Sequence, residues 1–138
     1  MSIHPFLQSA GAAQILLALS HLAFPRRFRW REELSRLSQM NREMFRVHTL
    51  FVALTVLLMG VPMLIDPGAW LERTRLGTWA AIGFTVFWGI RLVIQWFGYS
   101  SELWRGRRFE TWVHIAFTLL WTAFTTLGAV LIHHQLRP

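Results

Sequence analysis

The sequence predicts an all-α integral membrane protein in which four helices cross the bilayer and pack as a four-helix bundle. Apolar residues make up 54% of the 138 residues, and the mean hydropathy is +0.37. Four apolar stretches also reach the roughly 20 residues that a helix needs to cross the hydrocarbon. We place these spans at residues 5–24, 44–65, 77–97 and 111–132. Little chain remains outside them, so we expect a single four-span domain over residues 1–138.

The charge pattern predicts how the spans are oriented. The segment from Arg26 to Arg46, which covers the first link and the start of the second span, is rich in arginine: Arg26, Arg27, Arg29, Arg31, Arg36, Arg42 and Arg46. The third link carries Arg105, Arg107 and Arg108, whereas the second carries only Arg73 and Arg75. The positive-inside rule then puts links one and three in the cytoplasm and both termini outside. We expect the bacterial cytoplasmic membrane, and the missing basic residues before the first span argue against a signal peptide.

Composition also excludes several classes of function. The chain has no cysteine, so thiolate chemistry and iron–sulfur ligation by cysteine are ruled out. The arginines lie in short links without a nucleic-acid-binding motif, which indicates anionic lipid head groups and not nucleic acid as their partner. No hydrolase motif or close carboxylate pair occurs. Whether the protein is an enzyme stays open.

The first span is predicted to end at Phe24, because proline at position 25 disfavours a helical residue before it. One face of this span is small and polar, which would let a neighbouring backbone approach closely. That face carries Ala10, Gly11, Gln14, Ala18 and His21. From Trp30 onward apolar residues recur every three or four positions, which predicts an interfacial amphipathic helix running into the second span.

The other spans each carry a polar stripe at the helical period, and such a stripe should face protein. In the second span the stripe is Asn41, Met44, His48, Val52 and Thr55. In the third it is Trp88, Arg91, Gln95 and Tyr99. In the fourth it is Glu110, His114, Thr118, Trp121 and Thr125. An ionisable side chain inside a membrane is by default a candidate for function.

The candidate site lies where these stripes reach one depth. In the predicted orientation His21, His48 and His114 each lie about one turn from the cytoplasmic end of their span, and Arg91 and Gln95 lie in the last two turns of theirs. We therefore predict a polar cluster near the cytoplasmic face. The remaining histidines, at the outer termini, receive no role: His4, His133 and His134.

Three chemistries fit these residue types. Two of the three histidines could be axial ligands of haem b, with Arg46 or Arg91 pairing with its propionates. Alternatively, His21, His48 and His114, with Glu110, could hold a divalent metal such as iron or zinc. Without a metal, a histidine together with Arg91, Gln95 and Tyr99 could bind a quinone or an anionic lipid head group.

We expect a haem- or metal-binding membrane protein acting in electron transfer or redox chemistry, in partnership with a larger membrane redox complex. The alternative is a structural or lipid- or quinone-binding subunit without metal or haem. It has weight because a histidine or arginine one turn from the interface can also extend into the head groups.

Overall fold

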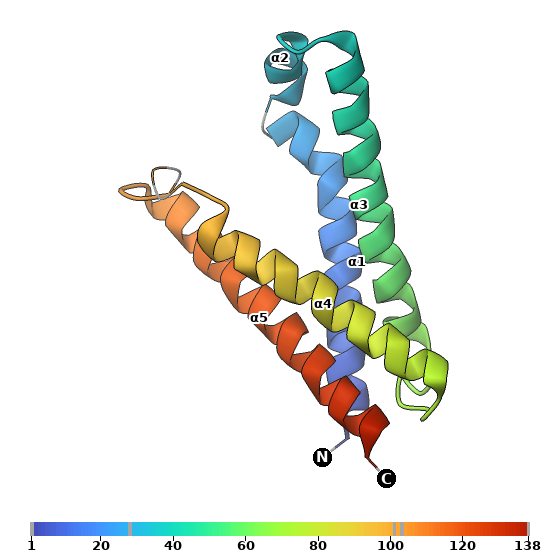
Figure 1. The fold of residues 1–138 in the computed structure, drawn as a ribbon. Helices are drawn as coiled ribbons and strands as arrows, with labels where there is room; N and C mark the ends of the chain where they lie inside the picture. The colour runs from blue at the N-terminus through green and yellow to red at the C-terminus, as the bar shows by residue number, and fades with distance from the viewer. Residues whose placement is uncertain (1, 28, 101, 103, 138) are drawn as a thin grey trace. The chain divides into compact units, whose positions relative to one another are not determined.

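The structure is a computed structural model that describes residues 2–27, 29–100, 102 and 104–137, without the side chains of Phe24, Arg26 and Arg27. Its helices are α1 (His4–Arg27), α2 (Trp30–Ser35), α3 (Gln39–Ile65), α4 (Arg75–Phe97) and α5 (Arg108–Leu136), shown in Figure 1. Each predicted span lies within one of the long helices. The all-α class is confirmed over this part of the chain.

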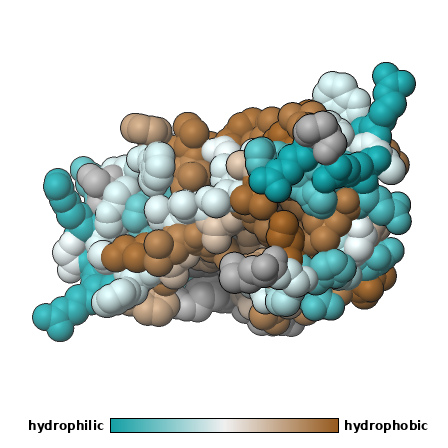
Figure 2. All heavy atoms as spheres, turned by 90° about the horizontal axis from the view of Figure 1, so that it is seen from below, coloured by the Kyte–Doolittle hydropathy of each residue, from teal (hydrophilic) through white to brown (hydrophobic). Residues whose placement is uncertain are grey.

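Within the described residues, four helices are long and apolar enough to cross a membrane: α1, α3, α4 and α5. Only 17–28% of each apolar window is buried inside the protein. Figure 2 accordingly shows apolar residues, in brown, on the surface that it displays. A soluble protein rarely exposes so much apolar surface to water, which supports a membrane protein.

The chain divides into two compact units, the first ending at Pro67 and the second beginning at Gly68. In the first unit α1 and α3 lie side by side and run in opposite directions (Figure 1). They cross at Gly11 and Gly60, where a Cβ on Gly11 would lie 2.7 Å from the Gly60 carbonyl oxygen. The close approach predicted for the small face of the first span is confirmed. Leu7, Ala10, Gln14 and Ala18 are buried along that face.

Within the first unit, the face predicted for the second span is not the face that packs on α1. The buried residues of α3 are Val56, Gly60 and Met63, whereas His48 is exposed and Val52 is 46% exposed. The polar stripe therefore does not face α1. Glycine at position 60 decides the packing face, because it alone on this helix lets the α1 backbone come so close.

Two predicted boundaries are also corrected. Helix α1 continues through Pro25 to Arg27, since a proline in the last turn removes a single helical hydrogen bond. The amphipathic helix does not run into the second span, because α2 ends at Ser35 and α3 starts afresh at Gln39. Ser38 caps α3 by accepting a hydrogen bond from the Asn41 amide at 3.3 Å.

The second unit is the antiparallel pair of α4 and α5, which lie side by side along their lengths (Figure 1). Buried residues recur at helical spacing on both helices, every three or four positions on α5 and with one gap of seven on α4. On α4 they are Ala81, Phe84, Trp88 and Gln95. On α5 they are Trp121, Phe124, Gly128, Leu131 and Gln135. The rings of Trp88 and Trp121 stack at 5.0 Å and fix the register of the two helices.

The end of this pair that holds the start of α4 and the end of α5 is closed by Gln135, which the sequence reasoning overlooked. Its Nε2 donates to the carbonyl oxygens of Trp70, at 3.0 Å, and Glu72, at 2.9 Å. Its Oε1 accepts from the Thr74 amide at 3.3 Å. One side chain thus ties the start of α4 to the end of α5. The signal was present, because Gln135 continues the spacing of three and four that begins at Trp121.

Candidate functional site

The predicted polar residues of the third and fourth spans meet in one network in the second unit. At its centre is Gln95, which is 5% exposed. The indole N–H of Trp121 donates to Gln95 Oε1 at 3.2 Å, and Arg91 Nη1 donates to the same oxygen at 3.3 Å. On the other side of the amide, Gln95 Nε2 lies 2.7 Å from His114 Nδ1. The amide therefore joins α4 to α5.

These contacts fix which way the Gln95 amide points. Indole and guanidinium nitrogens only donate hydrogen bonds, so the atom facing Trp121 and Arg91 must be the amide oxygen. The amide NH₂ then faces His114, and because NH₂ also only donates, His114 Nδ1 must accept. The neutral imidazole of His114 therefore carries its hydrogen on Nε2.

His114 Nε2–H is consequently a donor available to something outside the network. The residue is half-buried, and no described residue accepts a hydrogen bond from that nitrogen. The ring is also held from one face, because Trp104 stacks on it with 4.1 Å between centroids and 5° between planes. Trp104 is itself anchored, since its carbonyl oxygen accepts from Thr111 Oγ1 at 2.8 Å and from the Arg107 amide at 3.1 Å.

Arg91 brings a positive charge to the same place without a negative partner among the described residues. Its Nη2 donates to Tyr99 Oη at 3.4 Å, and its guanidinium carbon lies 5.0 Å from the Trp121 ring centre and 5.6 Å from that of Tyr99. Both aromatic faces attract a cation. An ion pair of the chain lies elsewhere, between Arg29 and Glu32, whose charged atoms are 2.9 Å apart.

Two histidines of the first unit, His21 and His48, differ from His114 because their Nδ1 atoms donate. His21 Nδ1 lies 2.8 Å from the Leu17 carbonyl oxygen, and His48 Nδ1 lies 2.8 Å from that of Met44. A carbonyl only accepts, so in both rings Nδ1 carries a hydrogen, and in the neutral imidazole Nε2 then holds the lone pair. That is the form in which Nε2 binds a metal while Nδ1 donates to a second partner.

The structure thus brings together four of the predicted site residues: Arg91, Gln95, Tyr99 and His114. His21, His48 and Arg46 belong to the first unit, where Arg46 is exposed. Glu110 is in the second unit and is also exposed. Among residues 2–27, 29–100, 102 and 104–137, no three histidine or carboxylate side chains are grouped so that they could hold a metal ion.

The histidines near the two termini make contacts that are local to each terminus. His133 Nε2 accepts from Arg137 Nε at 3.1 Å, four residues further along α5. His134 lies in the last turn of the same helix. The His4 amide donates to Ser2 Oγ at 3.4 Å. None of these contacts involves the Gln95 network.

Two members of the network were missed as site residues. Trp121 was not predicted as a site residue; it is buried against α4 and also donates to Gln95. Its place in the polar stripe of the fourth span was the available signal. Trp104 lies in the third link, and periodicity says nothing about a loop residue.

Comparison of this chain with models of protein families, with characterised proteins and with solved structures gave no match. Its functional interpretation therefore depends on the network of α4 and α5 itself.

Proposed function

We propose that this chain is a membrane protein whose α4–α5 pair binds the carbonyl head group of a membrane-soluble ligand, of the quinone class, at Arg91 and His114. The observation that carries the proposal is the orientation of Gln95. It leaves His114 with an outward N–H donor beside an arginine that has no carboxylate partner among the described residues.

A quinone fits this pair because its carbonyl oxygens accept hydrogen bonds and its ring is flat and apolar. Arg91 and His114 both form a hydrogen bond with the Gln95 amide, so their remaining N–H groups can donate to the same ligand. The rings of Trp104, Trp121 and Tyr99 surround these donors. Ligand sites are typically aromatic surfaces with a few placed polar groups.

The haem or metal function is the second candidate, and the ring form of His21 and His48 favours it. In the neutral form, a ring that donates from Nδ1 has the Nε2 lone pair that haem iron, zinc or non-haem iron requires. His114 does not, since its Nε2 carries the hydrogen. In this version His21 and His48 are the ligands, and Arg46 of the same unit would pair with the haem propionates.

In both versions the protein is placed in the bacterial cytoplasmic membrane, with links one and three cytoplasmic and both termini outside. Helix α2 then lies at the cytoplasmic interface, with Trp30 packed edge-on against Phe45 at 4.8 Å. A redox role would require a larger membrane complex to supply the electrons.

Ligand binding to the purified protein in mild detergent tests the first proposal. A short-chain benzoquinone should bind, and its hydroquinone dimethyl ether, which lacks both carbonyls, should bind at least about ten-fold more weakly. His114→Gln and Arg91→Gln should each weaken quinone binding by about ten-fold, the usual effect of losing a charge-assisted or well-placed hydrogen bond. His134→Gln is the matched control and should change nothing.

Equal binding of the quinone and its dimethyl ether would contradict the proposal, as would unchanged binding in both variants. A visible spectrum of the same preparation, expressed with haem and metals supplied, tests the second candidate. A Soret band lost in His48→Ala but kept in His114→Ala would favour haem in the first unit. Stoichiometric iron or zinc without that band would favour a metal site.

A further inference from the structure

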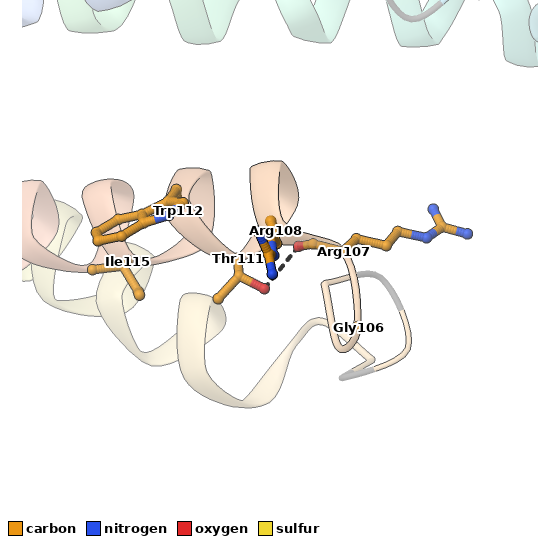
Figure 3. Close-up of a pocket in the computed structure, with 6 residues that line it drawn as sticks. All are labelled: Gly106, Arg107, Arg108, Thr111, Trp112 and Ile115. Carbon is orange, nitrogen blue, oxygen red and sulfur yellow. Dashed lines mark hydrogen bonds between the residues drawn. The ribbon is translucent and has the colours of Figure 1, made fainter.

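A hollow of about 470 Å³ lies at the start of α5, on the outside of the second unit. It is lined by Gly106, Arg107, Arg108, Thr111, Trp112 and Ile115. Figure 3 shows that Trp112 and Ile115 lie together at one end, while the Arg107 side chain extends away from them at the other. The hollow is thus basic at one end and apolar at the other.

The apolar end continues along α5 as an exposed stripe. Trp112 is 71% exposed, Ile115 40% and Leu119 66%. With Arg108 they stand at positions i, i+4, i+7 and i+11, which share one face of a helix. This face points away from the residues that pack on α4, such as Trp121. From Arg108 to Leu119 the helix rises about 16 Å, roughly half the 30 Å thickness of the hydrocarbon.

The basic end has no partner for its charge within the described part of the chain. Arg107 and Arg108 are exposed, and neither forms an ion pair with a described carboxylate. A hydrogen bond between two lining residues stabilises the hollow: Thr111 Oγ1 donates to the Arg107 carbonyl oxygen at 2.8 Å (Figure 3). The Arg107 backbone is therefore fixed while its side chain remains available.

We propose that this hollow is a binding site for one anionic phospholipid. The phosphate binds Arg107 and Arg108, and one acyl chain lies along Trp112, Ile115 and Leu119. Charge complementarity selects a lipid with net negative charge, and the length of the stripe matches one leaflet. The site is separate from the proposed quinone site, whose residues on α5, His114 and Trp121, lie on the opposite face of the helix.

Native mass spectrometry of the full chain with added lipid tests the proposal. Phosphatidylglycerol should be retained in preference to phosphatidylcholine, and inorganic phosphate in the same excess should not displace it. The double variant Arg107→Gln/Arg108→Gln should retain at least about ten-fold less phosphatidylglycerol, since each basic residue near an anionic lipid surface strengthens binding about five-fold. Arg31→Gln/Arg36→Gln in the first link removes the same charge and is the control.

Equal loss in the two double variants would overturn the proposal, because it would show attraction by net charge alone. Trp112→Ala tests the contact with the lipid's acyl chain separately from the contact with its head group. This variant should retain several-fold less long-chain phosphatidylglycerol and as much of a short-chain analogue as the wild type. Equal effects on the two lipids would contradict the placement of an acyl chain along Trp112.

Photocrosslinking is done on the wild-type chain, so its outcome does not depend on whether a variant folds. Phosphatidylglycerol with a photoreactive group in its acyl chain should label the wild-type chain mainly between Trp112 and Leu119. Labels spread evenly over the exposed faces of α1, α3, α4 and α5 would overturn the proposal.

Discussion

At the scale of single residues, Gln95 controls the chemistry of its neighbours. A side-chain amide both donates and accepts, and here each function is assigned by the partners around it. Gln95 is buried, so an unmatched donor or acceptor at this place would cost about 1–3 kcal/mol. The ring form of His114 follows from this requirement.

Gln95→Glu should therefore change the tautomer of His114, moving its hydrogen from Nε2 to Nδ1. A carboxylate only accepts, so His114 Nδ1 would carry the hydrogen and donate to it, and Arg91 would gain a counter-charge. Two-dimensional ¹⁵N spectra of the histidine-labelled protein report which nitrogen is protonated. The His114 signal is assigned by its absence in His114→Gln.

The wild-type spectrum is a test in itself. It should show the hydrogen of His114 on Nε2, and that of His48 on Nδ1. Finding it on Nδ1 of His114 in the wild-type protein would disprove the orientation that we assign to Gln95. His48 should be unaffected by Gln95→Glu, which makes it the internal control.

Gln14 is the opposite case, a buried polar residue whose hydrogen bonds are incomplete. Its Nε2 lies 3.3 Å from the Ala10 carbonyl oxygen and 3.4 Å from the Met63 sulfur. Its Oε1 is buried without a partner among the described residues. A half-satisfied polar group is worse than an apolar one of similar size.

Gln14→Met should therefore stabilise the packing of α1 on α3, by about 1 kcal/mol. Resistance to unfolding by SDS, followed by the loss of helix signal, measures this. Gln135→Met is the contrasting variant, since that glutamine satisfies three backbone groups, and it should destabilise the protein. Lower stability of Gln14→Met would indicate that Gln14 has a polar role in this helix pair.

At the scale of elements, both helix pairs contain a close crossing at a glycine, and in the α4–α5 pair this crossing adds to the packing of the buried stripes. Gly11 and Gly60 bring the α1 and α3 backbones together, and Gly128 does the same against Thr85 on α4. Close backbone contact gains dispersion energy, which is the main driving force when lipid replaces water around the helices.

Gly60→Ala should destabilise the first unit by about 1–3 kcal/mol, the usual cost of overpacking. The added Cβ would lie 2.8 Å from Gln14 Cβ and 2.9 Å from the Gly11 carbonyl oxygen. Gly83→Ala is the matched control, because a Cβ there meets nothing within 4 Å. SDS unfolding of both variants compares them directly.

The control should be neutral or slightly more stable, since alanine favours a helix over glycine by about 1 kcal/mol. If Gly60→Ala unfolds at the same SDS concentration as Gly83→Ala, the crossing at Gly60 is not the element that holds α1 to α3.

At the scale of the whole molecule, the sequence was sufficient for the class and for half of the candidate site. Apolar length alone predicts the four long helices, and the helical period correctly puts Arg91, Gln95 and His114 on facing stripes. The helical period does not predict which face of α3 packs on α1. That face is set by the glycine at position 60 and not by the polar residues around His48. The helical period also cannot place Trp104, which reaches His114 only through a loop with a positive φ of 79° at Gly106.

The orientation in the membrane is the last prediction, and the absence of cysteine makes it testable without background labelling. Single cysteines are introduced at Ser2 and Ala69, on the predicted outside, and at Ser35 and Glu102, on the predicted inside. A membrane-impermeant maleimide should label the first two in intact cells and the last two only after permeabilisation, because arginine-rich links stay in the cytoplasm. Labelling of Ser35→Cys in intact cells would invert the orientation and put the Arg91–Gln95–His114 network at the opposite face of the membrane.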